Sequence, residues 1–500
     1  MRKISYKFSS FINNALKFLF IFVVIGSKYR LTRDFASVKF SKFSVVFFII
    51  IILLGIILNY LMKKKFNTKI IFISILSVGL IIRLIWFYSI DSIPTSDFNR
   101  MYICAEDFLK GFTYMFEGTG YMARFPHMSI TVLYFSFVQK IFYKNPLIAI
   151  RLLNILFSML NMVILYFIAK EVFKDKKNVI WSLFLAAIYP PMIIYNNAYA
   201  SENIAMPIFL LSIYLFLKSI NKDRKIKLLI GAFFILALAN LFRPIAYVVI
   251  VAYILYILIY FKEGIKRKVI LVSTSIMSFI IPTLLVSYGL IYLNILERPL
   301  WKPTEPASIS ILKGTNFESN GRWNEEDAKV FGECDENYEK ADKRAKEIIR
   351  ERLLGSKKTD ILRHYATKYA FQWNTGDFGG ICWAEAGLET ESNREKYLKI
   401  MEKNDGKELI KLSKDGESLV QLIYTIMILI TYLALYKKKR NYKLDLMYIL
   451  FCGFSIQCLI TESQDRYTYV VSWIFILLAM NFFESESKVF IRNGEESSER

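Results

Sequence analysis

Long apolar segments alternate with short polar segments along most of the chain. Residues 43–62 contain no charged side chain, and a cluster of lysines follows them directly. Similar apolar runs recur further along, at residues 178–195, 269–293, 418–436 and 466–483. A helix of about 20 apolar residues spans the roughly 30 Å hydrocarbon core of a bilayer. The pattern therefore predicts an all-α polytopic membrane protein.

Composition agrees with this prediction and narrows the possible partners. Hydrophobic residues make up 55% of the 500 residues, and the net charge is +22. In a soluble protein such a charge would suggest nucleic acid. Here the basic residues lie in short clusters between apolar segments, as they do in the cytoplasmic loops of membrane proteins. We therefore expect a lipid bilayer and no nucleic acid among the partners.

The basic clusters also predict the topology. The strongest clusters are residues 63–69, 170–177, 218–227, 262–268 and 437–443. If all of them are cytoplasmic, the apolar segment 70–90 runs outward, and the loops that begin at residues 91 and 298 are external.

An odd number of crossings must then separate residue 91 from the cluster 170–177. We expect residues 125–142 to form a helix at the outer interface and residues 147–168 to cross. Residues 11–26 are followed by Ser27-Lys28-Tyr29-Arg30, which is not a small-residue cleavage site, so they should be a retained helix. The result is a bundle of about twelve spans with both termini inside.

The chain divides into four expected parts: an N-terminal membrane extension (1–62), a catalytic membrane module (63–293), an external loop (294–417) and C-terminal spans with a tail (418–500). The external loop carries clusters of Trp and Gly, which favour a folded cap. Its two cysteines, Cys334 and Cys382, either pair or remain free thiols. The chain has no CxxC pair and only two histidines, so neither a metal site nor a cofactor is expected.

The loop 91–111 places carboxylates at the end of a predicted span. Pro94 and Ser96 predict a turn, and the apolar residues that follow have the spacing of a short amphipathic helix on the membrane. Asp97 lies near the start of that helix. It is either a catalytic carboxylate or an N-cap that accepts backbone N–H bonds, and the same residue can do both.

Three further polar features lie at the predicted outer ends of spans. Glu202 lies between two apolar segments, and Arg243 precedes a proline that interrupts a long apolar run. Arg243 marks either a buried polar site or a hairpin turn whose arginine extends to water. The last external loop contains Glu462, Arg466 and Tyr467, and its alternative interpretation is a solvated loop.

All these side chains face the same side of the membrane in the predicted topology, although none was used to derive it. Arginine binds phosphate through forked hydrogen bonds, and a carboxylate can deprotonate a hydroxyl group. An external group of carboxylates and arginines under an aromatic cap suits a phosphate-linked lipid substrate.

The order of these motifs resembles that of the GT-C fold membrane glycosyltransferases, in particular the glycosyltransferase family 39-like group that contains protein O-mannosyltransferases and the lipid A aminoarabinose transferase. The resemblance covers roughly residues 70–293 and, more weakly, 461–473. The matching motifs are, in order, SDxxxxYxxAxxxxxG, a Pro-led helix after Phe125, YPPMIIYNNAYASEN, LANLFRP and ExxxRYxY.

The resemblance implies an enzyme that uses a polyprenyl-phosphate sugar, with inversion at the anomeric carbon and without a metal. It implies that Asp97 is the general base, that Arg243 and Arg466 hold the lipid phosphate, and that Glu202 orients a substrate.

It also implies substrate contacts for a further set of residues, namely Asp91, Tyr102, His127, Glu462 and Tyr467. Phe98 stands where some relatives have a second acid, so Asp91 could share the role of Asp97. An interfacial histidine with access to water is the alternative for His127.

Two other functions remain open. One is a flippase or exporter of lipid-linked glycans, which needs ionisable residues along a path within the spans; Arg83 and Arg151 are the main candidates. The other is a GT-C-type polymerase or ligase of wall glycans. The acceptor of a glycosyltransferase could be a wall polymer, a glycolipid or a protein. The Lys-, Ile- and Asn-rich composition suggests a bacterial plasma membrane.

Overall fold

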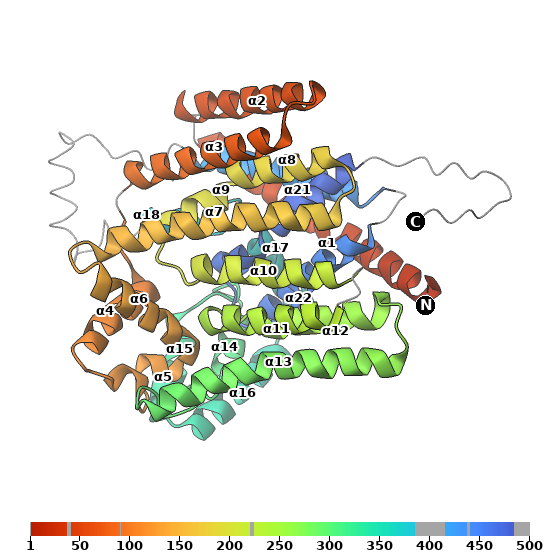
Figure 1. Cartoon of the computed structure of the whole chain (residues 1–500). Helices are drawn as coiled ribbons and strands as arrows, with labels where there is room; N and C mark the ends of the chain where they lie inside the picture. Colours follow the sequence, from red (N-terminus) through yellow and green to blue (C-terminus); the bar gives the residue numbers. More distant parts are fainter. Residues whose placement is uncertain are drawn as a thin grey trace.

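The computed structural model describes residues 2–37, 42–90, 92–220, 225–385, 416–437 and 441–484. Within these ranges the protein is helical and has no β-strand. Long helices run side by side to form one bundle, and a group of shorter helices covers one end of it (Figure 1). Asp91 lies outside the described residues. The all-α polytopic architecture predicted from the apolar periodicity is confirmed.

Nine helices of the described residues are long and apolar enough to cross a membrane. They are α1 (Arg2–Ser37), α2 (Lys42–Lys63), α3 (Thr68–Ser89), α7 (Pro146–Val172), α10 (Glu202–Ser219), α11 (Lys225–Phe242), α13 (Ile265–Tyr292), α21 (Glu417–Ala434) and α22 (Tyr442–Ile460). Two further pairs of helices are each bent at a short break, and counting each pair as one span raises the number to eleven. One shorter apolar helix, α12 (Ala246–Tyr260), is also present. Together with the nine helices and the two bent pairs, it coincides with the twelve predicted spans.

The two bent pairs are broken by local sequence. In the first, α8 (Lys176–Ile188) is followed by α9 (Pro190–Ile194) and the short helix η3 (Tyr195–Asn197), with a bend of 49°. Two consecutive prolines begin α9 and remove backbone donors that a continuous helix would need. In the second pair, η5 (Asp465–Val471) meets α23 (Ile474–Met480) and η6 (Asn481–Phe483) at 60°.

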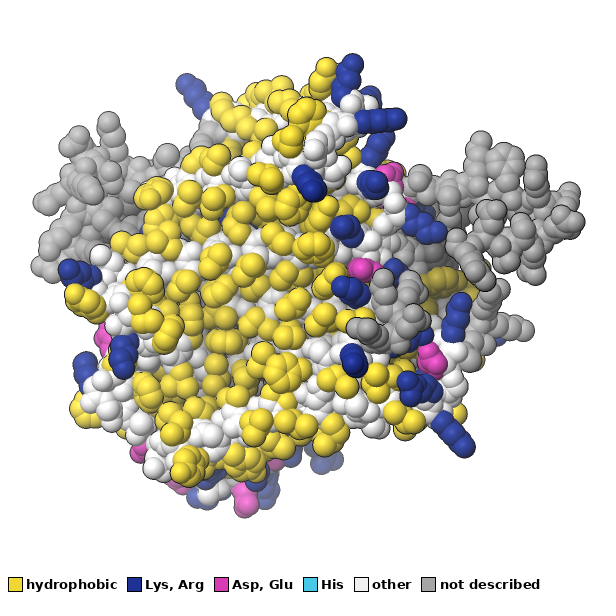
Figure 2. Space-filling model, viewed as in Figure 1, with side chains coloured by type: hydrophobic (Ala, Val, Ile, Leu, Met, Phe, Trp, Pro, Cys, Tyr) yellow, Lys and Arg dark blue, Asp and Glu magenta, His cyan; other side chains and the backbone are white. Residues whose placement is uncertain are grey.

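Basic clusters that are far apart in sequence meet at one end of the bundle. Asn441 donates to the carbonyl oxygen of Val172 at 2.9 Å, and Lys443 lies 4.0 Å from the carboxylate of Glu171. Figure 2 shows a broad hydrophobic surface across the middle of the molecule, with many Lys and Arg side chains along one edge. This distribution fits the topology in which these clusters share the cytoplasmic side.

The opposite end carries two short helices that pack against each other, α4 (Ser96–Leu109) and α6 (Ser129–Ile141) (Figure 1). The 13 residues of α6 are too few to cross a bilayer, whereas α7 is one of the nine candidate spans. The structure thus agrees with a single crossing between residues 125 and 168. Between α4 and α6 lie the helical turns η1 (Tyr114–Phe116), α5 (Tyr121–Arg124) and η2 (Pro126–Met128).

The predicted external loop is folded over its described part, which ends at residue 385. It contains α14 (Ala307–Gly314), α15 (Glu325–Glu333), α16 (Tyr338–Gly355), α17 (Lys358–Trp373) and α18 (Gly380–Glu385), which we call the cap. Ile309, Leu312, Val330 and Ala345 form a small core of its own. Cys334 and Cys382 are free thiols, so the disulfide alternative is not what the structure shows.

One large hydrophobic core runs through the bundle, from Ile12 of α1 to Met480 of α23. It includes Trp373 of the cap and residues of all four sequence segments. The division of the chain into four parts with separate roles stays a prediction.

Candidate active site

Asp97 lies in the first turn of α4, where its carboxylate faces two donors from distant parts of the chain. Tyr121 donates its hydroxyl to Oδ1 at 2.6 Å, and Nη2 of Arg466 donates to Oδ2 at 2.8 Å. The N-cap position of α4 is occupied by Thr95. Asp97 is therefore not the N-cap, which was one of the two interpretations open from the sequence.

The ionisation of Asp97 depends on these contacts. Burial alone would raise the pKa of the carboxyl group, but the charge of Arg466 and the hydrogen bonds from Tyr121 and Arg466 outweigh it. The pKa of Asp97 is consequently held below its ordinary value. The carboxylate form is thus favoured, as a proton acceptor requires, while its basicity is weakened for as long as Arg466 is paired with it.

Arg466 lies in η5 and its side chain is 6% exposed. Its guanidinium group lies over the rings of Trp383 at 4.6 Å, Phe98 at 5.2 Å and Tyr467 at 5.5 Å. Its Nε atom is buried and has no hydrogen-bond partner among the described residues. This donor is therefore available to a ligand, and a buried donor without a partner is costly unless a ligand satisfies it.

Arg243 and Glu202 form a second ion pair in the site. Nη2 of Arg243 lies 3.2 Å from Oε1 of Glu202, whose side chain is 1% exposed. Oε1 receives no well-aligned hydrogen bond from the described residues, so it too can accept one from a ligand. Arg243 does lie in the turn between α11 and α12, but its side chain is only 15% exposed and stacks on Tyr467 at 5.2 Å. The structure thus favours the buried polar site over an arginine that extends to water.

Glu462 is held by three donors. Tyr467 donates its hydroxyl to Oε1 at 2.9 Å, Gln464 donates to the same atom at 2.8 Å, and Nζ of Lys313 lies 2.9 Å from Oε2. Lys313 belongs to α14 of the cap. The alternative of a solvated loop is not what the structure shows, because Glu462 and Arg466 are both buried.

Sequence reasoning missed Lys313 and Tyr121 as members of this group. Neither lies in a motif that stands out by composition, and each reaches the site only through the packing of a short helix. The hydroxyl group of Tyr121 is bonded to Asp97, and its ring lies 4.5 Å from the guanidinium group of Arg100. The preceding Gly120 allows a close backbone approach, since a Cβ there would lie 2.6 Å from the carbonyl oxygen of Met115.

The other predicted site residues occupy different surroundings. His127 lies in η2, where burial and the nearby charge of Arg243 lower the pKa of its imidazole to about 4. Tyr102 packs its ring against Phe135 of α6, and its carbonyl oxygen accepts a hydrogen bond from Gln139. The substrate contacts proposed for both remain predictions. Asp91, outside the described residues, cannot be placed relative to Asp97.

A mostly apolar cavity of about 290 Å³ lies beside the polar site. Helices α11, α12 and α13 and the segment before the cap form its walls, and the polar side chains of its lining are His127, Asn240 and Thr283. Its apolar lining includes Tyr247, Phe279 and Trp301. Pro244, which follows Arg243 in the chain, is a lining residue, and His127 of the lining is near enough to Arg243 and Asp97 for their charges to affect its pKa. Its polar edge and apolar walls match a ligand that has a charged head and a hydrocarbon tail.

The site as a whole combines three carboxylates with three cations: Asp97 with Arg466, Glu202 with Arg243, and Glu462 with Lys313. Within the described ranges, no three His, Cys, Asp or Glu side chains lie close enough together to hold a metal ion. The arrangement can accept a proton at Asp97 and offer an unpaired donor at Arg466.

Residues 111–286 match a family model described as dolichyl-phosphate-mannose-protein mannosyltransferase. The resemblance to GT-C membrane glycosyltransferases is thereby confirmed, and the match supports a mannosyltransferase-like membrane enzyme that uses a lipid-linked sugar. The matched segment contains Glu202 and Arg243, whereas Asp97 and Arg466 lie outside it. No curated protein and no solved structure matches the chain.

Proposed function

We propose that this membrane glycosyltransferase moves a sugar from a polyprenyl phosphate to the hydroxyl group of an extracytoplasmic acceptor, with inversion of the anomeric carbon. The observation that carries the proposal is the contact between Asp97 and Arg466. It joins a proton acceptor to a phosphate-binding side chain that still has an unpaired Nε donor.

The reaction follows from this pairing. The acceptor oxygen attacks the anomeric carbon as the bond between that carbon and the phosphate oxygen breaks, and the electron pair leaves with the phosphate. The acceptor proton passes to Asp97. Arg466 and Arg243 bind the phosphate as its negative charge increases. When Arg466 turns from Asp97 to the phosphate, the pKa of Asp97 rises, which makes it a better base at the moment of transfer.

The apolar cavity supports a lipid-linked donor. Pro244, the neighbour of Arg243 in the chain, lines it, so a phosphate held by that arginine would have apolar walls nearby for the first isoprene units. We propose the plasma membrane of a bacterium as the location, and a wall polymer, glycolipid or protein as the acceptor. These points are supported by the external position of the site in the charge-derived topology and by the composition of the chain.

The flippase alternative is weakened by the two buried arginines. Arg83 donates to the hydroxyl of Ser158 at 2.8 Å and to carbonyl oxygens of Gly79 at 2.9 Å, Ala187 at 3.1 Å and Ala186 at 3.3 Å. Arg151 donates to the carbonyl of Ile90 at 2.9 Å. Both side chains therefore satisfy backbone groups near helix ends instead of facing a path.

The deciding experiment is Asp97→Asn in membranes supplied with a labelled polyprenyl-phosphate sugar. Loss of a general base lowers the rate by about 10²- to 10⁴-fold. Asp107→Asn is the matched control, because Asp107 lies on the same helix and its carboxylate contacts the nearby Tyr114 and Lys110. Undiminished transfer in Asp97→Asn excludes Asp97 as the base. Headgroup translocation in liposomes without formation of a glycosidic bond would support the flippase instead.

A further inference from the structure

A buried lysine of the cap binds the chain segment that leads to Arg466. Lys368 of α17 is 1% exposed. Its Nζ donates to the carbonyl oxygens of Gly314 at 2.8 Å, Leu459 at 2.9 Å and Thr461 at 2.6 Å. An ammonium group has three donors, so every one of them is used. Lys368 thus joins the end of α14 to the end of α22.

Backbone and side-chain contacts reinforce this junction. The amide of Glu462 donates to the carbonyl of Ser310 at 2.7 Å, and the amide of Ser463 donates to the carbonyl of Gly321 at 2.9 Å. Lys313 adds its ion pair with Glu462. Residues 459–463 are therefore held by the cap along their length, and η5 with Arg466 begins two residues later.

The junction is close enough to require glycine at two positions. A Cβ at Gly314 would lie 2.6 Å from the carbonyl carbon and oxygen of Thr461. A Cβ at Gly321 would lie 2.6 Å from Cε of Lys368, and Gly321 also has a φ of +73°. Both approaches are shorter than van der Waals contact. An added methyl group at Gly314 would push the cap away from residues 459–463, and one at Gly321 would displace the side chain of Lys368 within the cap.

We propose that Lys368 is a positioning residue that fixes the segment 459–463 and thereby places the backbone of Arg466 where its side chain can turn from Asp97 to the donor phosphate. The cap is then a fixed part of the active site instead of a lid. The proposal rests on the role of Arg466 in the proposed function. Its physical basis is that a displacement of about 1 Å at a binding group lowers activity by up to about 10²-fold.

The protonation of Lys368 gives a second readout. The groups that face it are Cys458 of α22, Glu462 of the following segment and His364 of α17. Burial lowers the pKa of Lys368 to about 8, and the neighbouring Cys458 and Glu462 oppose the shift only in part. Above that pH the amine loses one of its three donors, so we expect the KM for the donor to rise.

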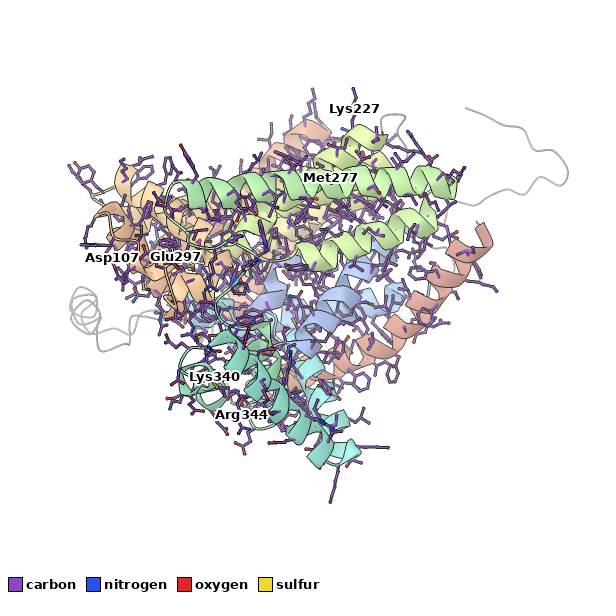
Figure 3. All side chains as sticks on the ribbon, turned by 90° about the horizontal axis from the view of Figure 1, so that it is seen from below. Asp107, Lys227, Met277, Glu297, Lys340 and Arg344 are labelled. Atoms are coloured by element: carbon purple, nitrogen blue, oxygen red, sulfur yellow. The ribbon has the colours of Figure 1, made fainter. Side chains whose placement is uncertain are left out.

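The experiment compares Lys368→Met and Gly314→Ala with the wild-type protein in detergent micelles, using a labelled polyprenyl-phosphate sugar. Lys340→Met is the control, because Lys340 lies on an exposed part of α16 that points away from the bundle (Figure 3). Two quantities are measured: amide hydrogen exchange of residues 461–467, and the donor KM from pH 6 to 9.

The proposal predicts faster exchange of residues 461–467 and a donor KM raised about tenfold in both variants, with a smaller change in kcat. The rise in KM above about pH 8 should be present in the wild type and absent in Lys368→Met. Gly314→Ala keeps the lysine and provides the test if Lys368→Met does not fold. Unchanged exchange, or an unchanged donor KM despite faster exchange, overturns the proposal.

A failure of the proposed function can be distinguished from a failure of the proposal for Lys368. If Arg466→Gln itself leaves the donor KM unchanged, Arg466 does not bind the donor, whatever the exchange data show for Lys368.

Discussion

Nη2 of Arg466 donates a 2.8 Å hydrogen bond to Oδ2 of Asp97, across a sequence separation of 369 residues. The contact joins the first to the last of the loops that the charge pattern predicts to be external. Each residue also keeps a group that can interact with a substrate. Asp97 can accept a proton, and Nε of Arg466 has no partner among the described residues. A ligand phosphate that binds Arg466 would therefore alter the basicity of Asp97 directly.

The hydrogen bond from Tyr121 should be visible in the pH dependence of transfer. Tyr121→Phe removes one of the contacts that lower the pKa of Asp97. A hydrogen bond to a charged group contributes about 1.5–3 kcal/mol, which corresponds to a shift of one pKa unit or more. Because transfer needs the carboxylate, the acid limb of kcat/KM should move to higher pH in the variant.

Tyr114→Phe is the control for this prediction, because Tyr114 donates to Asp107, also on α4 but away from the site, at 2.6 Å. The same shift affects stability, since a lowered pKa stabilises the folded protein above the ordinary pKa of aspartate. That contribution is lost as the pH falls through the lowered pKa. An acid limb that stays in place in Tyr121→Phe would show that Asp97 does not titrate in the reaction.

Replacing only one partner of the ion pair between Arg243 and Glu202 should lower the stability of the protein. Arg243→Met leaves the buried carboxylate of Glu202 without its counter-charge, which destabilises a protein by about 3–5 kcal/mol. The double variant Arg243→Met with Glu202→Gln should recover most of the stability and none of the transfer. Thermal unfolding in detergent and a transfer assay measure the two effects.

The comparison pair is Lys329 with Glu325, whose side chains are 61% and 70% exposed. Its disruption should leave stability unchanged, because exposed ion pairs contribute little. Full transfer by the double variant would remove Arg243 and Glu202 from the mechanism.

The apolar cavity should make transfer depend on the length of the donor lipid. Thr283 lines the cavity from α13, and Thr283→Trp would fill much of it. The donor KM should rise about tenfold for a polyprenyl donor and little for a donor whose phosphate carries only a methyl group, because each buried CH₂ contributes about 0.8 kcal/mol.

Met277→Trp is the matched control for the cavity. Met277 lies on the same helix, is 54% exposed and does not line the cavity (Figure 3). Equal sensitivity of long- and short-chain donors to Thr283→Trp would mean that the cavity does not hold the lipid.

His127 should be uncharged throughout the physiological range. Burial and the charge of Arg243 lower its pKa to about 4, so a proton binds only below that pH. We expect His127→Asn to keep the pH dependence of transfer between pH 5 and 8. A limb near pH 6 that disappears in His127→Asn would instead identify His127 as a titrating group of the reaction.

The bundle was predictable because lipid imposes a simple rule on sequence. Every segment that crosses must be apolar over about 20 residues, since no water is present to satisfy exposed backbone groups. The single crossing between residues 125 and 168 was predictable for a related reason. The lysines at 170–177 could share a side with the other clusters only if α6 did not cross, and α6 has 13 residues.

The residues that form the site were harder to predict from the sequence. The sequence selected Asp97, Glu202, Arg243 and Arg466 because they share one side of the predicted topology and lie in motifs whose order resembles that of the GT-C glycosyltransferases. It could not select Lys313, Tyr121 or Lys368, because the cap and the first loop are rich in residues of the same kinds. Nothing in their local patterns separates a surface lysine from one that is 1% exposed.

The sequence by itself determined that the chain is a helical membrane protein, and it predicted which loops share a side and which charged residues those loops contain. Only the tertiary structure decided how those charges are paired: Asp97 with Arg466, Glu202 with Arg243, and Glu462 with a lysine of the cap. The reason is physical. The apolar pattern of a segment indicates whether that segment lies in lipid or in water. Ion pairs between distant loops depend instead on how the helices pack, and no local sequence pattern specifies that packing.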